Sequence, residues 1–160
     1  MISVCFVCLG NICRSPMAEL VFKKMVKEKG LENSFRVTSC GTEAEEGCSV
    51  YHNAKLTLER HNVEGNHIAR QLTKSDIINN DYILVMDSAN LSDVLRLCSG
   101  ALGEKVYKLT AFTSRPRDVS DPWYTRDFEK AYSDIYEGCE RFLDYLILEH
   151  SAALNYDKRH

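Results

Sequence analysis

Two side chains near the start of the chain have the chemistry to act on one small molecule. Cys8 carries a thiol, a strong nucleophile once ionised, and Arg14 carries a planar guanidinium that can hold two oxygens of a phosphate at once. Only five residues separate them, so a loop that curls between them can point both side chains at one centre. A nucleophilic sulfur beside a phosphate-binding guanidinium predicts transfer of a phosphoryl group to sulfur.

The residues around this pair predict a strand, a turn and a helix in succession. Residues 2–7 are apolar and typical of a buried strand, whereas Gly10 and Asn11 readily take the backbone angles of a tight turn. Ser15 then predicts a helix N-cap, with Pro16 at the first helical position. At such a turn backbone N–H groups converge on an anion, and the positive end of the helix favours an ionised thiol. The expected phosphate-binding loop consists of Cys8, Leu9, Gly10, Asn11, Ile12, Cys13, Arg14 and Ser15.

Asp121 is the candidate proton donor for the leaving group. It stands before Pro122, which stiffens the loop, and before two aromatic residues, Trp123 and Tyr124. A carboxyl group beside a phosphate and a thiolate is held protonated by the neighbouring negative charge, and after it has ionised it can activate water. The two aromatic rings predict either walls that sandwich an aromatic leaving group or rings tucked onto the core.

The string Cys8-Leu-Gly-Asn-Ile-Cys-Arg-Ser-Pro16 resembles the signature of the low-molecular-weight protein tyrosine phosphatases, and the resemblance covers most of the chain. It implies hydrolysis of phosphotyrosine in proteins, and of small aryl phosphates, through a phosphocysteine intermediate without metal or cofactor. Cys8 is then the nucleophile, Arg14 and the loop amides bind phosphate, and Asp121 serves as general acid and then base. The implied partners are phosphotyrosine-containing proteins or peptides, with phosphate, sulfate or vanadate as bound anions.

The resemblance also implies supporting roles around the loop. Asn11 matches an asparagine held in a strained left-handed conformation, and Ser15 matches a hydroxyl that stabilises the thiolate and the departing group. Ser39 and His67 match positions of the same supporting network, and Asp87 is similar to an aspartate near the site. From residue types alone, however, Ser15 and Asp87 are equally well helix caps, and His67 is as readily a structural histidine.

Cys13 shares the expected loop with Cys8. The matching cysteine of the family forms a reversible disulfide with the nucleophile, which implies a redox switch that protects the enzyme from over-oxidation. A disulfide needs α-carbons within about 7 Å, a distance that a curled loop permits.

Residues 43–54 depart from the family pattern of a short Gly-Thr-Ser-Gly-aromatic stretch followed by a Pro-Pro-Asp-x-Arg-like segment. The first part is lengthened by Glu43, Ala44, Glu45 and Glu46. Cys48 occupies a position where an aromatic residue is common, and Tyr51 is the candidate replacement for the missing ring, so both are candidate substrate walls. The glutamates by themselves predict a solvated surface loop. The catalytic loop and the acid loop are untouched by these changes, so the chemistry is better predicted than the specificity.

Apolar runs and helical periodicities alternate along the chain. The expected strands are 2–7, 35–39, 82–86 and 105–109, and the expected helices are 16–29, 53–62, 73–77 and 127–150, with another that Asp87 and Ser88 cap and that buries Leu91, Val94, Leu95 and Cys98. This order predicts a single α/β domain with a four-stranded parallel sheet and helices on both faces. We expect right-handed crossovers and a flavodoxin-like or Rossmann-like winding, with the strands in the order 2-1-3-4. In such sheets ligands bind at the carboxyl ends of strands, which the Cys8 loop and Asp87 both follow directly.

Length and composition indicate one domain of ordinary size. The chain has 160 residues, of which 44% are hydrophobic and 27% charged. We expect the phosphatase domain to cover residues 1–150 and the tail 151–160, which has no apolar stripe, to be frayed. The net charge of −3 without a long basic run argues against nucleic acid as the main partner, and we expect a monomer.

The cysteines and the N-terminus indicate a compartment. The N-terminal apolar run is far too short for a signal or a membrane span, and the seven cysteines are an odd number, so we expect free thiols in the cytoplasm and no membrane association. Cys5 and Cys8 lie three residues apart on a strand and therefore face opposite sides of the sheet, which argues against a shared metal ion.

Three other functions use related sites. A thiol-dependent arsenate reductase also binds an oxyanion with this motif, but it needs further redox cysteines on a mobile segment after the third strand. Only Cys98 lies there, on the expected buried face of a helix and without a second cysteine to pair with. An inactive phosphotyrosine-binding module would need neither the nucleophile Cys8 nor the acid Asp121. A phosphocysteine carrier in sugar transport would have no use for Asp121. A phosphatase, in contrast, uses Cys8, Arg14 and Asp121 together.

Overall fold

The sheet is built around β1 (Ile2–Cys8), a strand in which every residue is buried. The computed structural model describes residues 1–155 and places β2 (Phe35–Gly41) and β3 (Tyr82–Val85) on either side of β1, with β4 (Val106–Lys108) beyond β3. All three strand pairs are parallel. The predicted four-stranded parallel sheet and its strand order 2-1-3-4 are therefore confirmed.

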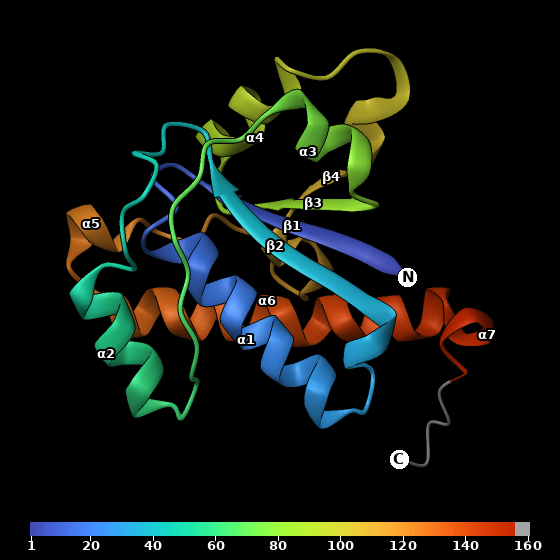
Figure 1. The fold of residues 1–160 in the computed structure, drawn as a ribbon, viewed down its shortest axis with the longest axis horizontal. Helices are drawn as coiled ribbons and strands as arrows, with labels where there is room; N and C mark the ends of the chain where they lie inside the picture. The colour runs from blue at the N-terminus through green and yellow to red at the C-terminus, as the bar shows by residue number, and fades with distance from the viewer. Residues whose placement is uncertain (156–160) are drawn as a thin grey trace.

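Helices cover both faces of this sheet (Figure 1). One face carries α1 (Arg14–Glu28) and the long α6 (Phe128–Glu149), against which α2 (His52–Arg60) also packs. The other face carries α3 (Lys74–Asn79) and α4 (Ser88–Leu95). The remaining helical elements are short: η1 (Glu32–Ser34), η2 (Gly100–Lys105), η3 (Leu109–Phe112), α5 (Pro122–Thr125) and α7 (Ser151–Leu154). Within residues 1–155, no helix combines the length and the apolar character needed to cross a bilayer.

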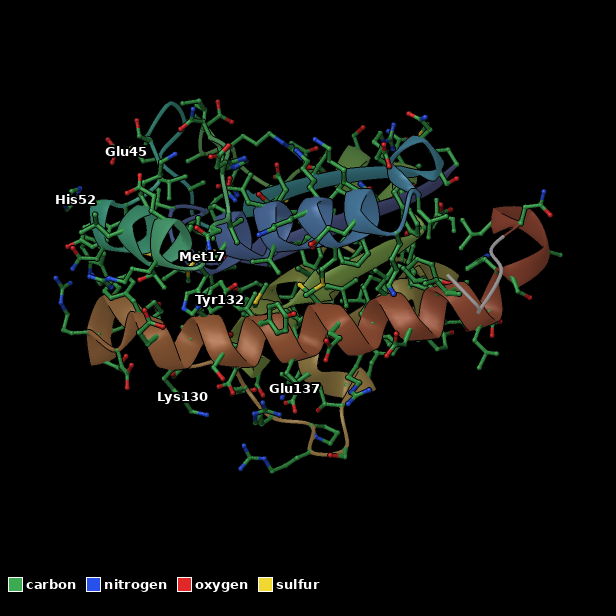
Figure 2. All side chains as sticks on the ribbon, turned by 90° about the horizontal axis from the view of Figure 1, so that it is seen from below. Met17, Glu45, His52, Lys130, Tyr132 and Glu137 are labelled. Carbon is green, nitrogen blue, oxygen red and sulfur yellow. The ribbon has the colours of Figure 1, made fainter. Side chains whose placement is uncertain are left out.

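Alternate residues of β1 enter two separate cores, because successive side chains of a strand point to opposite faces. Val4, Phe6 and Cys8 belong to the large core under α1 and α6, whereas Cys5 belongs to the smaller core under α3 and α4. Cys5 and Cys8 therefore face opposite sides of the sheet, as predicted. Figure 2 shows Met17 of α1 and Tyr132 of α6 in the layer where the two helices meet.

The start of α1 differs from the prediction. The helix begins at Arg14 rather than Pro16, and the residue in the N-cap position is Cys13, which makes no side-chain capping bond. Ser15 therefore lies inside the first turn of the helix and not at its N-cap. Its hydroxyl contacts the sulfur of Cys8 instead. The other end is as predicted: Gly30, with a φ of 70°, ends the helix in the left-handed conformation that glycine adopts without strain.

The helix after β3 is shorter than predicted. It ends at Leu95, and of the residues expected on its buried face only Val94 is fully buried, while Leu95 is 42% exposed. Cys98 lies beyond the helix and is half-buried, with its sulfur 3.4 Å from the carbonyl oxygen of Val94.

The C-terminal segment also differs. The expectation of fraying from Ser151 is wrong for the first residues, because α7 forms there and buries Leu154 against the large core. A single apolar residue gives no periodic stripe in the sequence, yet it is enough to dock one helical turn. The remainder of the expected tail, from residue 156 onward, lies outside the described residues.

Candidate active site

The carboxyl end of β1 and the start of α1 enclose the sulfur of Cys8. The Cys8 side chain is buried, its sulfur lies 2.9 Å from the Ser15 hydroxyl, and it accepts a hydrogen bond from the Asn11 backbone N–H at 3.3 Å. The sulfur is thus within hydrogen-bond distance of both the Ser15 hydroxyl and the Asn11 N–H. Ser15 is thus placed where the resemblance put it, next to the nucleophile.

Asn11 holds the loop in an uncommon conformation. Its φ is 57°, and its buried side-chain amide donates to Ser15 Oγ at 2.8 Å and to Ser39 Oγ at 3.1 Å. Its Oδ1 accepts from His67 Nε2 at 2.7 Å and from the Arg70 backbone N–H at 3.0 Å. Four hydrogen bonds offset the cost of a left-handed residue that is not glycine, which is of order 1–3 kcal/mol. The strained asparagine and its partners Ser39 and His67 are therefore brought together as predicted.

Glu19, which the sequence analysis missed, lies behind this network. Its carboxylate is buried and accepts from Ser39 Oγ at 2.7 Å, lies 3.3 Å from His67 Nδ1 and pairs with Lys23 at 2.7 Å. Although burial alone would raise the pKa of Glu19, the hydrogen bonds from His67, Lys23 and Ser39 bring that pKa below its ordinary value. A charged residue four positions after Ser15 on the buried side of a helix was the available sequence signal.

Arg14 lies at the base of the site with a guanidinium that is almost fully buried. It donates to Asp87 Oδ2 at 2.7 Å and to the Val119 carbonyl at 2.8 Å. The second oxygen of Asp87 accepts the backbone N–H of Asn90 at 2.8 Å and so caps α4. Asp87 is therefore a helix cap and an anchor for Arg14 at the same time, whereas its residue type alone left the two roles as alternatives. Burial would lower the pKa of Arg14, but the negative groups around it raise the pKa further above its ordinary value.

Asp121 reaches the same arginine from the other side. It caps the short helix α5, with Oδ1 accepting the Trp123 backbone N–H at 3.0 Å and Pro122 in the first helical turn. The other oxygen lies 3.4 Å from a terminal nitrogen of Arg14. One carboxylate oxygen is thus fixed by the cap while the other faces the site.

These groups converge on one cavity of about 190 Å³. Its lining consists of Cys8, Leu9, Gly10, Ile12, Cys13, Arg14, Glu43, Asp121, Trp123 and Tyr124. Trp123 is 47% exposed and Tyr124 is 74% exposed, so the alternative in which both rings are tucked onto the core is wrong. Glu43 was expected only as part of a solvated loop, and its position in the lining was not predicted.

Cys48 and Tyr51, the two predicted walls of residues 43–54, do not line this cavity. Tyr51 instead packs edge-on against Trp123, with ring centroids 5.0 Å apart, and its hydroxyl accepts a hydrogen bond from Arg126 at 3.0 Å. Cys48 pairs through its backbone with Ala69, whose N–H donates to the Cys48 carbonyl at 2.8 Å. The chain turns away from the cavity between Glu43 and Cys48, so only the first of the inserted residues reaches the cavity.

Cys13 lines the same cavity as Cys8. Burial, followed by the nearby negative charges of Cys8 and Asp121, raises the pKa of Cys13 to about 12. Cys13 is therefore a neutral thiol at pH 7.

A cysteine whose sulfur contacts a loop amide and a serine hydroxyl, a buried arginine and a carboxyl group that faces the same cavity define a cysteine-dependent phosphatase site. The site lies at the carboxyl end of a central parallel strand, as expected for a doubly wound α/β fold.

Several known phosphatases are similar to this chain. Residues 3–158 match the family of the low molecular weight phosphotyrosine protein phosphatases. The chain is 40% identical over 148 residues to the Gallus gallus member and 38% identical to the Homo sapiens member, in each case covering 89% of this chain and 94% of the relative. Its structure is similar to YfkJ from Bacillus subtilis, with a TM-score of 0.89 and 34% identity over 93% of this chain and 96% of that one. It is also similar to a protein tyrosine phosphatase from Entamoeba histolytica, with a TM-score of 0.87 and 30% identity over 95% and 99% of the two chains. The chain therefore belongs to the low molecular weight phosphotyrosine protein phosphatase family and is a hydrolase of that class.

Proposed function

We propose that this enzyme hydrolyses phosphotyrosine through a phosphocysteine intermediate. The phosphoryl group binds against Arg14 and the amides of the catalytic loop, and the Cys8 sulfur attacks phosphorus while the bond to the tyrosyl oxygen breaks. Asp121 donates its proton to that leaving oxygen. The resulting carboxylate then takes a proton from water, which attacks the phosphocysteine, releases phosphate and restores the thiolate. The convergence of Cys8, Arg14 and Asp121 on one cavity carries this proposal.

The exposed aromatic rings at the mouth of the cavity support an aryl substrate. Trp123 and Tyr124 offer faces between which a phenyl ring can stack, and Ile12 and Leu9 add apolar surface below them. A phosphotyrosine in a protein or peptide fits this arrangement, because its ring extends the phosphate to the buried sulfur. The shorter phosphoserine side chain lacks that reach.

The proposal includes redox regulation of the enzyme through Cys8 and Cys13 and its location in the cell. Oxidation of Cys8 to a sulfenic acid by peroxide would let the Cys13 thiol displace water from it and form a disulfide, which a dithiol reduces again. The presence of both sulfurs in one cavity lining supports this switch. A thiolate nucleophile requires a reducing compartment, so we place the enzyme in the cytoplasm, as a monomer. Its one phosphatase domain extends through α7, and it binds phosphate, sulfate or vanadate as competing anions.

Hydrolysis of p-nitrophenyl phosphate in the presence of EDTA tests the proposal. Cys8→Ser should abolish turnover, and Asp121→Ala should lower kcat by about a hundredfold or more. Cys98→Ser, which removes a half-buried thiol outside the cavity, is the matched control and should keep wild-type activity. Substantial turnover in Cys8→Ser would end the scheme, and loss of activity in EDTA would show that a metal takes part.

A further inference from the structure

Glu43 is held against the catalytic loop by its backbone. Its N–H donates to the Leu9 carbonyl at 2.8 Å, and the N–H of Thr42 donates to the Cys8 carbonyl at 3.0 Å. The chain runs so close to the loop at Gly41 that an added β-carbon would stand 2.6 Å from the Leu9 carbonyl oxygen. Glu43 therefore has a fixed position relative to the nucleophile, although it stands at the start of an exposed loop.

The side chain of Gln71 fixes the same segment from the other direction. Its amide oxygen accepts the Ala44 N–H at 2.8 Å, and its amide nitrogen donates to the Thr42 carbonyl at 2.8 Å. Hydrogen bonds on both sides of Glu43 therefore hold its backbone at the rim of the catalytic cavity.

The carboxylate of Glu43 has no ionic partner among residues 1–155, although it lines the catalytic cavity. Arg14, the cation at the base, is already shared between Asp87 and Asp121. Arg126 lies near the mouth as well, but it donates to the Tyr51 hydroxyl and stacks on the Tyr51 ring. Besides the Cys8 sulfur, the lining thus presents one carboxylate without an ionic partner, at an exposed position, to a substrate that enters.

We propose that Glu43 is a specificity residue that favours phosphotyrosyl substrates with lysine or arginine next to the phosphotyrosine and disfavours acidic neighbours. The inference rests on the proposed phosphotyrosine phosphatase activity. With the phosphate on Arg14 and the phenyl ring between the aromatic walls, the residues that flank the phosphotyrosine lie at the mouth of the cavity. A long cationic side chain there can approach the Glu43 carboxylate, whereas an acidic one is repelled by it.

The expected effect is modest, because Glu43 is exposed to solvent. An exposed ion pair changes kcat/KM by about two- to fivefold, and a like-charge pair changes it by a similar factor in the other direction. Screening at about 0.5 M salt should reduce both factors toward one.

Three phosphotyrosyl peptides that carry lysine, glutamine or glutamate on both sides of the phosphotyrosine provide the test. The wild type should give kcat/KM in the order lysine, glutamine, glutamate, and Glu43→Gln should slow hydrolysis of the lysine peptide while speeding hydrolysis of the glutamate peptide. Changes of opposite sign separate a charge effect from a damaged site, which would slow all three. Glu45→Gln is the matched control, because Glu45 carries the same charge on the same loop but lies at its outer edge, away from the cavity lining (Figure 2).

The inference is overturned by a Glu43→Gln enzyme that keeps the wild-type order and ratios, or by a Glu45→Gln enzyme that loses them to the same extent. Both are distinct from failure of the proposed function, which would appear as no hydrolysis of any of the three peptides by the wild type. A preference that persists unchanged in high salt would also overturn it, because a screened charge cannot then be the cause.

Discussion

Replacing Asp87 should separate two roles that one carboxylate performs. Its Oδ1 caps α4 through the Asn90 N–H, and its Oδ2 pairs with Arg14 at 2.7 Å. Asp87→Ser keeps a side-chain oxygen for the cap but is too short to hold the arginine, whereas Asp87→Ala removes both functions. We therefore expect the two variants to differ in stability but to share one catalytic defect.

The structure sets the size of each effect. The Asp87 carboxylate is one of the charged partners of a guanidinium that is 2% exposed, and loss of a hydrogen bond between charged groups costs about 1.5–3 kcal/mol. Loss of a cap adds about 1 kcal/mol, so the free energy of unfolding should fall by about 1.5–3 kcal/mol in Asp87→Ser and about 2.5–4 kcal/mol in Asp87→Ala. Arg14 keeps its bonds to Val119 and Asp121, so it is misaligned rather than released, and kcat/KM should fall about ten- to a hundredfold in both variants.

Urea unfolding and hydrolysis of p-nitrophenyl phosphate measure the two effects separately, and inhibition by inorganic phosphate should weaken together with kcat/KM. Asp127→Ala is the control, because Asp127 caps α6 through the Lys130 N–H at 2.9 Å without touching Arg14. It should lose about 1 kcal/mol of stability and keep its activity. If Asp87→Ser folds and retains wild-type kcat/KM and phosphate inhibition, Asp87 is a cap alone and the reasoning is refuted.

Three further predictions concern the cavity and the network behind it. After mild peroxide, wild-type enzyme should regain activity with dithiothreitol and show a Cys8–Cys13 disulfide by mass spectrometry, whereas Cys13→Ser should be lost irreversibly; sulfinic acid at Cys8 in the wild type would contradict this. Because the folded-state pKa of Glu19 is depressed below 4.5, its carboxylate stabilises the fold above that pH and the contribution is lost as the pH falls through the folded-state value. Glu19→Gln should therefore be less stable than wild type at pH 7 by urea unfolding, with the gap narrowing as the pH falls below the ordinary carboxyl range; a gap independent of pH would exclude this cause. Trp123→Ala should lower kcat/KM for p-nitrophenyl phosphate about three- to tenfold while glycerol phosphate changes little, and equal losses on both substrates would argue against a stacking wall.

The sheet was predictable because its signals are local. Each strand is a short apolar run followed by a turn or a helix start, and the parallel order follows from the alternation of strands with helices. The helix ends were less predictable where a side chain has a partner outside its own helix. Ser15 was predicted as a cap because Ser-Pro is a common helix start, but its hydroxyl lies 2.9 Å from the Cys8 sulfur, and the helix begins two residues earlier than predicted, at Arg14.

The parts of the site that the sequence did not indicate come from tertiary contacts. Glu19 is a charged residue on a helix face that is otherwise apolar, and only folding brings Ser39 and His67 to it from other elements. Glu43 belongs to a run of glutamates whose composition predicts a solvated loop, and it is the hydrogen bonds of this segment with the catalytic loop and with Gln71 that hold it at the cavity. The composition of the run does not indicate which of its glutamates lines the cavity. The backbone hydrogen bonds of the folded chain do, because they hold Glu43 and not its neighbours beside the catalytic loop.

The two aspartates of the site show how local and distant information combine. Asp87 and Asp121 each cap a helix with Oδ1 and turn Oδ2 toward Arg14, so each cap fixes the angle at which its carboxylate meets the guanidinium. Their catalytic consequences differ because their positions differ. Asp87 lies directly after β3, on a rigid sheet edge, and its short contact keeps the arginine in place. Asp121 caps a four-residue helix and lines the cavity, and its contact with Arg14 is longer at 3.4 Å, which fits the proposal that it turns from Arg14 to the leaving oxygen. In the proposed mechanism, two carboxylates that follow the same capping rule thus take different roles, one as an anchor and one as an acid, and their different distances to Arg14 are what supports that division.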